Sequence, residues 1–177
     1  MGLFLSTTIN KVDKKGRVSV PAAFRAAVVD RAVDGRGVEG RDDPALSFQG
    51  IVVFRSFKHD ALDGAGMDRM EALSASLDQM DSFSDDQDDL AATIFADARQ
   101  LPFDGEGRVV IPDDMMQFAG IADRCAFVGR GKTFQIWEPD AFAAHQSNAR
   151  ARIRARVRDG DVAFPKAGAS PEHGGRQ

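Results

Sequence analysis

Lysine and arginine side chains gather near the start of the chain, at Lys14, Lys15 and Arg17. The ammonium groups of the two lysines suit the phosphates of a nucleic acid. The guanidinium of Arg17 is a planar fork of donors that can reach the acceptor edge of a guanine. Phosphate contacts position a protein on DNA and base contacts specify the sequence, so this segment could do both. We therefore predict that Lys14, Lys15 and Arg17 contact double-stranded DNA.

Asp13 gives Arg17 a second possible role. An aspartate four positions before an arginine can form an internal ion pair that holds the turn and orients the arginine. Arg17 would then be a structural partner of Asp13, and the two roles can coexist. We expect Asp13 and Gly16 to stabilise the turn. Arg25, on the helix that we expect next, is a weaker candidate for the DNA face.

A strand, a tight turn and a second strand must position these side chains. β-Branched residues precede and follow the turn residues 13–16, which is typical of a hairpin. Pro21 cannot donate to a sheet ladder and ends the second strand. Residues 22–28 then favour a short helix.

The same unit returns 91 positions later, where Asp104, Gly107 and Arg108 match Asp13, Gly16 and Arg17. A repeat of this kind indicates two copies of one supersecondary unit. We expect Asp104, Gly107 and Arg108 to stabilise the second turn. Glu106 stands where the first copy has a lysine, and its carboxylate would repel phosphate. The first turn is therefore the predicted DNA contact, and the second mainly supports the fold and assembly.

The paired Asp-x-x-x-Arg turns, each followed by a β-branched strand and a proline-initiated helix, resemble the MraZ family of bacterial transcriptional regulators. Residues 3–6, 90–95 and 127–138 fit the same family, and the resemblance covers about residues 1–150. It implies an α+β fold made of two AbrB-like (SpoVT-AbrB) halves. Their swapped hairpins would interlock in one tandem β-barrel with flanking helices.

The resemblance also implies a function. Proteins of this family form closed rings of identical chains and bind repeated short boxes upstream of the division and cell-wall gene cluster. They act mostly as repressors, including at their own promoter. We accordingly expect a sequence-specific DNA-binding regulator that forms a homo-oligomer and needs no cofactor, in the cytoplasm and associated with the nucleoid.

The predicted organisation places the first half at residues 1–62, a helical connector at 63–100 and the second half at 101–145. A polar, glycine-rich stretch near 30–47 predicts a mobile insertion. Residues 146–177 would be an arginine-rich helix end and a disordered tail. The apolar strands expected at 48–54 and at 134–137 read as counterparts in the two halves. Further elements are predicted by apolar periodicity or by turn residues: a helix from Met67 to Met80, a helix that Ser84 caps, a helix at 112–119 and a hairpin at 126–137.

Two motifs that suggest other ligands lack the context they need. Gly35–Gly40 matches a dinucleotide fingerprint by its letters, but no buried strand precedes it and no helix follows. The acidic run from Asp81 to Asp89 lacks the glycine and the terminal glutamate of a calcium loop. We expect a solvated helix start there.

Composition bounds the remaining possibilities. The chain has 177 residues, 43% hydrophobic and 28% charged, with a net charge of −4. That balance argues against a surface that is basic throughout, although positive charge can be concentrated on one face. No apolar run is long enough to span a membrane, and no secretion signal is recognised. The single cysteine, Cys125, is expected to be a buried small hydrophobe.

Catalytic and metal sites are not apparent. The three histidines are scattered, no zinc spacing occurs and no nucleophile motif is present, so we do not expect an enzyme. The alternative function is a protein-interaction or adaptor module without DNA binding. The arginines at alternate positions of residues 150–158 spread around a helix, which suggests a solvated or fraying end. An accessory nucleic-acid contact is the other interpretation of this stretch.

Overall fold

The fold is known from a computed structural model, which describes residues 2–34 and 48–161. The chain divides into a unit Met1–Phe142 and a unit Ala143–Gln177. The predicted glycine-rich insertion and the predicted tail fall mostly on residues 35–47 and 162–177, outside the described residues.

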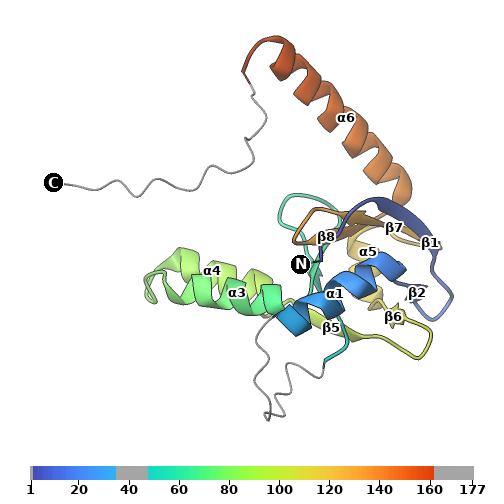
Figure 1. Cartoon of the computed structure of the whole chain (residues 1–177). Helices are drawn as coiled ribbons and strands as arrows, with labels where there is room; N and C mark the ends of the chain where they lie inside the picture. Colours follow the sequence, from blue (N-terminus) through green and yellow to red (C-terminus); the bar gives the residue numbers. More distant parts are fainter. Residues whose placement is uncertain (1, 35–47, 162–177) are drawn as a thin grey trace. The chain divides into compact units, whose positions relative to one another are not determined.

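The first turn unit has the predicted elements (Figure 1). Strand β1 (Thr7–Lys11) and strand β2 (Arg17–Ser19) flank the turn. Helix α1 (Ala22–Asp34) starts after Pro21, where a proline in the first turn costs no hydrogen bond. It is longer than predicted and continues through residues 30–34, which we had expected to belong to the loop.

A hairpin and two helices follow. Strand β3 (Gly50–Arg55) matches the predicted apolar run, whereas strand β4 (Leu62–Ala65) was not foreseen. Its sequence, Leu-Asp-Gly-Ala, has neither β-branched residues nor an apolar alternation. Helices α3 (Met67–Asp78) and α4 (Asp85–Ile94) confirm the two predicted amphipathic helices. Ser84 caps α4, because its hydroxyl accepts a hydrogen bond from the Gln87 backbone N–H at 3.2 Å.

The second turn unit repeats this order. The remaining elements are strand β5 (Arg99–Pro102), strand β6 (Arg108–Val110), helix α5 (Asp113–Phe118), strand β7 (Arg124–Gly129), strand β8 (Phe134–Trp137) and helix α6 (Pro139–Arg158). Gly120 follows α5 at φ 64°, the left-handed conformation that glycine adopts without strain, and ends that helix as predicted.

The two halves exchange strands. The large antiparallel sheet has the order β1-β7-β8-β4-β3-β5, so β1 of the first half pairs with β7 of the second, and β5 of the second pairs with β3 of the first. Strands β4 and β8 pair at the centre. The counterpart of Phe134–Trp137 is therefore β4, and the predicted echo with residues 48–54 is wrong, because β3 holds the position that corresponds to β7.

Among the described residues the strands do not close into a barrel. Strands β1 and β5 stand at opposite edges of the six-stranded order. Strands β2 and β6 form a separate two-stranded sheet in which Val18 lies opposite Val109. The architecture is mixed α and β, with an antiparallel sheet, as the predicted class requires.

The small sheet locks each turn to the other half. The Val20 N–H donates to the Gly107 carbonyl at 3.1 Å, and the Ile111 N–H donates to the Gly16 carbonyl at 2.9 Å. Each turn glycine thus accepts a hydrogen bond from the strand end of the opposite copy.

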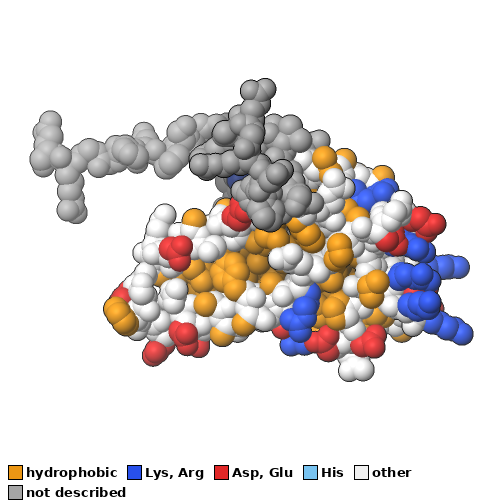
Figure 2. Space-filling view, turned by 90° about the horizontal axis from the view of Figure 1, so that it is seen from below, with side chains coloured by type: hydrophobic (Ala, Val, Ile, Leu, Met, Phe, Trp, Pro, Cys, Tyr) orange, Lys and Arg blue, Asp and Glu red, His pale blue; other side chains and the backbone are white. Residues whose placement is uncertain are grey.

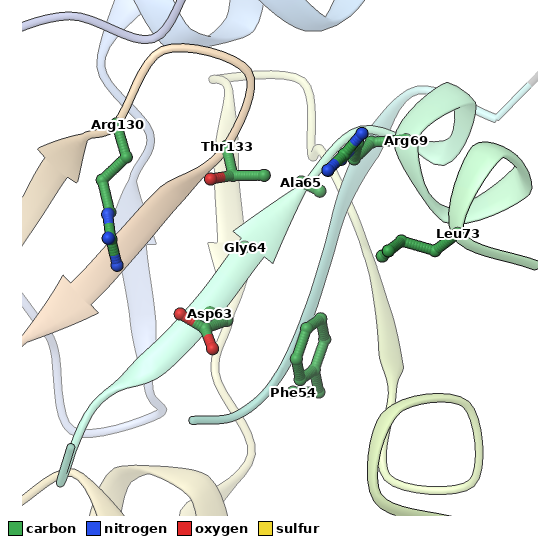
Figure 3. Close-up of a pocket in the computed structure, with 8 residues that line it drawn as sticks. All are labelled: Phe54, Asp63, Gly64, Ala65, Arg69, Leu73, Arg130 and Thr133. Atoms are coloured by element: carbon green, nitrogen blue, oxygen red, sulfur yellow. The ribbon is translucent and has the colours of Figure 1, made fainter. Parts of the chain in front are cut away.

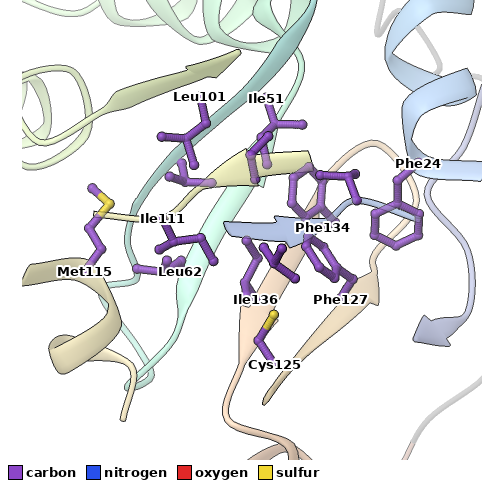
Figure 4. Packing of buried hydrophobic residues seen from close by; sticks show 14 of the residues in the cluster. Phe24, Ile51, Leu62, Leu101, Ile111, Met115, Cys125, Phe127, Phe134 and Ile136 are labelled. Carbon is purple, nitrogen blue, oxygen red and sulfur yellow. The ribbon is translucent and has the colours of Figure 1, made fainter. Parts of the chain in front are cut away.

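Side chains from both halves form one core (Figure 4). The Phe24 ring meets the rings of Phe4, Phe127 and Phe134 with centroids 5.2, 6.1 and 5.4 Å apart, geometry that aromatic pairs favour. Cys125 is fully buried, as predicted, and burial raises the pKa of its thiol to about 12. It is therefore a packing residue and not a reactive thiol.

The interlock gives a testable difference between two glycines with left-handed backbones. A Cβ on Gly16 (φ 77°) would stand 2.8 Å from the Ile111 carbonyl oxygen, whereas a Cβ on Gly120 (φ 64°) has no atom within 4 Å. Both Gly→Ala variants pay a conformational cost of about 1–2 kcal/mol. We expect Gly16→Ala to lower the free energy of unfolding by a further ~1 kcal/mol or more, because it also disturbs the hydrogen bond to Ile111. Urea denaturation of both variants measures the difference, and equal destabilisation would contradict the interlock.

Candidate nucleic-acid interface

One carboxylate organises the first turn. Asp13 Oδ1 accepts hydrogen bonds from the backbone N–H groups of Lys15 and Arg17, both at 2.9 Å. Its Oδ2 accepts from Arg17 Nε at 2.6 Å. The Gly16 N–H donates to the Asp13 carbonyl at 3.0 Å, and Gly16 takes φ 77°. The side chain of Asp13 thus holds the loop and the direction of Arg17 together.

These hydrogen bonds stabilise the ionised form of the Asp13 carboxylate. The backbone N–H of Arg17 is the largest cause that holds the pKa of Asp13 below its ordinary value, and the Arg17 guanidinium and the Lys15 N–H act in the same direction. The pKa of Asp104 is lowered in the same way, first by the Arg108 N–H. Hydrogen bonds to a charged form favour that form.

The cations of the first turn point to solvent. Lys14 and Lys15 are exposed, and neither forms an ion pair with another described residue. Arg17 is partly exposed, and its Nε is held by Asp13. Within the described part of the chain its two terminal nitrogens donate no hydrogen bond, so they remain available for an acceptor.

The second turn has the same frame and a different charge. Asp104 accepts from the backbone of Glu106 and Arg108 at 2.9 Å each and from Arg108 Nε at 2.8 Å. Glu106 Oε2 also lies 3.1 Å from Arg108 Nη2. Asp104, with the largest effect, and Glu106 both raise the pKa of the Arg108 guanidinium. Among the described residues, two carboxylates therefore engage Arg108, whereas one engages Arg17.

The two-stranded sheet brings both arginines to one face. Val18 and Val109 point into the core, so the alternate positions point outward. In the register, Arg17 lies opposite Val110, and Ser19 lies opposite Arg108. Figure 2 shows Lys and Arg side chains gathered along one edge of the face in view, with Asp and Glu side chains spread over that face, some of them beside the cations. The net charge of −4 is thus compatible with a basic surface.

Arg25 has a packing role that the sequence did not reveal. A Cβ added to Gly107 would collide with the Arg25 guanidinium, so this side chain lies directly on the second turn. Its Nε is buried and has no hydrogen-bond partner among the described residues. The position that corresponds to Arg25 in the second half is Met116, whose sulfur would lie 3.7 Å from a Cβ on Gly16. Each helix therefore covers the turn of the other half, and the repeat offset was the signal that could have indicated it.

A separate cavity of about 290 Å³ lies between β4, α3 and the loop that joins β7 to β8 (Figure 3). Phe54 and Leu73 give it an apolar wall, and Arg69 and Arg130 give it positive charge. The Nε of Arg69 is buried, and no described residue accepts a hydrogen bond from it. The cavity could hold an apolar group that is accompanied by a carboxylate. It was not predicted, because its residues come from three separate segments.

The described residues provide neither a metal site nor a membrane-spanning helix. Within residues 2–34 and 48–161 no three His, Cys, Asp or Glu side chains are arranged to hold a metal ion. None of the described helices combines the length and the apolar character that crossing a membrane requires.

Known proteins resemble this chain over most of its length. A family model described as "MraZ protein, putative antitoxin-like" matches residues 94–159. The Transcriptional regulator MraZ of Gluconobacter oxydans is 41% identical over 155 residues, which cover 87% of each chain. The protein of the same name from Pelagibacter ubique is 39% identical over 148 residues, or 84% of this chain and 86% of the relative. That of Gluconacetobacter diazotrophicus is 38% identical over 154 residues, or 87% and 90%.

The depressed carboxylate pKa values predict how stability depends on pH. In the unfolded chain Asp13 and Asp104 titrate near 3.8, and in the folded protein they titrate lower. Their contribution is complete above pH ~4 and is lost as the pH falls from there through the folded pKa. We expect the double variant Asp13→Asn, Asp104→Asn to have a lower urea midpoint at pH 7 and a flatter decline below pH ~4.

The control for this experiment is Glu71→Gln, which removes an exposed carboxylate from α3. Urea midpoints measured from pH 7 to about 2.5 make the comparison. If the double variant kept the parent's full acid sensitivity, the two turn carboxylates would not be the groups that sense pH.

Proposed function

Because the chain belongs to the MraZ family, we propose that it is a transcriptional regulator that binds double-stranded promoter DNA through the turn Asp13–Arg17. The proposal rests on the exposure of Lys14 and Lys15 and on the orientation of Arg17. Lys14 and Lys15 are exposed, and Arg17 is oriented by Asp13 with its terminal nitrogens available. The names of the relatives support the regulatory role.

The residues of the first turn divide the work. Lys14 and Lys15 neutralise DNA phosphates and hold the turn against the sugar–phosphate backbone of the DNA. Arg17 presents its terminal nitrogens to the edge of a base, where two parallel hydrogen bonds distinguish guanine. Asp13 and Gly16 keep the loop in one conformation, which lowers the entropy lost on binding. Arg25 comes from helix α1, and its guanidinium lies on the second turn. From there it adds a further positive charge to the DNA-binding surface.

The second turn has a supporting role in this proposal. Glu106 and Asp104 occupy the guanidinium of Arg108, and the exposed carboxylate of Glu106 opposes a phosphate. The turn still completes the two-stranded sheet that holds the first turn in place. We propose that the two halves are AbrB-like and that their exchanged strands correspond to the swapped hairpins of that fold.

The finer parts of the proposal rest on the family resemblance. They are repression of the division and cell-wall gene cluster, including the protein's own promoter, binding to repeated short boxes, and association with the nucleoid in the cytoplasm. One turn offers few charges, so a single copy would hold DNA weakly. A ring of copies on repeated boxes converts weak contacts into high avidity.

Two features of the surface support assembly between copies. The tip between α3 and α4 presents Phe83, which is 96% exposed, between Asp81 and Asp85. The Phe83 N–H donates to Asp81 Oδ1 at 3.1 Å, so the tip is an ordered turn. The cavity beside α3 offers the complement, with an apolar wall and two arginines. We propose that the tip of one copy enters the cavity of the next. Such a head-to-tail contact forms a closed ring when the rotations between neighbouring copies add up to a full turn.

The first prediction of this proposal concerns DNA affinity. We expect Arg17→Ala to weaken binding to promoter DNA by about tenfold to a hundredfold, and to reduce discrimination between operator and unrelated DNA. Lys14→Ala and Lys15→Ala should weaken binding to all sequences and lower the salt slope by about 0.9 each. Gel-shift titrations at several salt concentrations measure both effects.

The second turn supplies matched controls. Arg108→Ala should change affinity much less than Arg17→Ala, because Arg108 already has two carboxylate partners. Glu106→Lys restores the charge that the first turn has at the corresponding position, and should raise affinity and the salt slope. Unchanged affinity in all three first-turn variants would refute the DNA contact and favour an adaptor role.

The assembly contact has its own test. We expect Phe83→Ala to shift the protein to smaller species in light scattering at micromolar concentration, because it removes an apolar anchor. The fold should persist, since Phe83 is 96% exposed. The charge reversal Arg69→Glu should act in the same direction. A parent and a Phe83→Ala variant with the same mass distribution would show that the tip is not an interface.

A further inference from the structure

The second unit presents a helix with an unusual charge. Helix α6 ends in five exposed arginines, Arg150, Arg152, Arg154, Arg156 and Arg158, and no Asp or Glu occurs from Ala141 to Arg158. Among the described residues, one of these arginines forms an ion pair: Arg158 Nε lies 3.9 Å from Asp159 Oδ1, on the surface. Like charges four positions apart destabilise a helix, so the sequence has a built-in repulsion here.

The helix nevertheless ends in a regular cap. Gly160 takes φ 78°, its N–H donates to the Val157 carbonyl at 3.2 Å, and the Asp161 N–H donates to the Arg156 carbonyl at 2.9 Å. This pair of bonds is the Schellman motif. Of the two interpretations drawn from the sequence, a solvated helix end agrees with the exposure of these arginines, and the accessory nucleic-acid contact stays a prediction. The arginines are held on an ordered helix.

Helical geometry sorts the arginines into two rows. At about 100° per residue, Arg150, Arg154 and Arg158 form one row, and Arg152 and Arg156 form a second row on the opposite side. Between the rows, on one flank, lie Ala149, Ile153 and Val157, and the last two are each 44% exposed. The other flank holds the small residues Ala151 and Ala155.

This arrangement matches the major groove of DNA. The groove is about 12 Å wide and admits a helix, whose diameter with side chains is about 10–12 Å. A helix in the groove has a phosphate backbone on each side, so two opposite rows of arginine can reach both walls. The flank between the rows then faces the floor, where thymine methyl groups make apolar contacts. Bound phosphates would also relieve the repulsion between the arginines.

A membrane surface fits these residues less well. Helices that lie in a membrane interface carry a broad apolar face with Trp, Phe or Leu. Here the apolar flank consists of two β-branched residues and alanine, and arginine borders it on both sides.

We propose that the C-terminal half of α6 is a second DNA-binding element, which lies in the major groove and clamps phosphates on both walls with its two arginine rows. The proposal rests on the proposed DNA binding of the first turn and adds a contact that depends little on sequence. It increases the affinity for any duplex, whereas Arg17 of the first turn provides discrimination.

The test compares three variants of the full chain. In the first, Arg150, Arg154 and Arg158 are changed to Gln. In the second, Arg152 and Arg156 are changed to Gln, and the third combines both sets. Glutamine has a helix propensity close to that of arginine, and circular dichroism checks that the helix persists. The control is Ala151→Gln with Ala155→Gln, on the flank that faces away from the groove. The probe is a random-sequence 30-bp duplex, titrated at several salt concentrations.

The two rows give separate expected results. Each lost phosphate contact lowers the slope of log affinity against log salt by about 0.9. We expect a decrease of about 2.7 for the row of three, about 1.8 for the row of two, and nearly the sum for the combination. Between 50 and 200 mM salt the parent should lose about 40-fold more affinity than the row-of-three variant. The control should match the parent.

Other outcomes overturn the proposal in distinguishable ways. A parent that binds the duplex and a combined variant with the same slope would show that α6 is not a DNA contact, while the first-turn proposal stands. A decrease confined to one row would refute the two-walled clamp. If the combined variant lost binding to vesicles that contain phosphatidylserine but kept the parent's DNA slope, the arginines would serve a membrane. A parent that binds no duplex even at low salt would remove the first-turn proposal as well.

Discussion

Reciprocal hydrogen bonds at the ends of β2 and β6 join the two halves of the first unit. The Gly16 carbonyl accepts from the strand end of the second half, and the Gly107 carbonyl accepts from that of the first. Because of this reciprocity, each turn, whose loop is shaped locally by its own aspartate, is also joined to the strand end of the other copy. The valines at the centre of the sheet are buried in the common core, so the exposed face above them is fixed by the same packing that stabilises the fold.

Within that frame the two turns have the same backbone and opposite electrostatics. An aspartate accepts two backbone N–H groups and one arginine Nε in each copy. The side chains differ at two positions, where the first turn has Lys14 and Lys15 and the second has Gly105 and Glu106. The glutamate contacts Arg108 Nη2, whereas no residue that the structure describes accepts a hydrogen bond from the terminal nitrogens of Arg17. A local contact thus distinguishes the two arginines without any change of fold.

Much of this could be predicted from the sequence. The Asp-x-x-x-Arg spacing predicted both turns and their ion pairs, because the interaction is local and the repeat confirms it. Apolar periodicity predicted α3 and α4, and Cys125 was correctly assigned to the core. Strand β4 was missed, because Leu62–Ala65 is stabilised by pairing with β3 and β8 and not by its own propensity. The packing of Arg25 on Gly107 and the cavity beside α3 depend on segments far apart in the sequence, which no local pattern reports. The charge pattern of residues 150–158 was visible, but its division into two rows needed a helix that is ordered to its end.

The strand exchange between the halves has a consequence for the history of such a chain. Two identical units that swap strands must evolve together, since any substitution appears in both. Once they are joined in one polypeptide, as Arg25 and Met116 illustrate at equivalent positions, each copy can accumulate its own substitutions while the other preserves the shared scaffold. Covalent linkage therefore permits a division of labour that a symmetric dimer of single units could not reach.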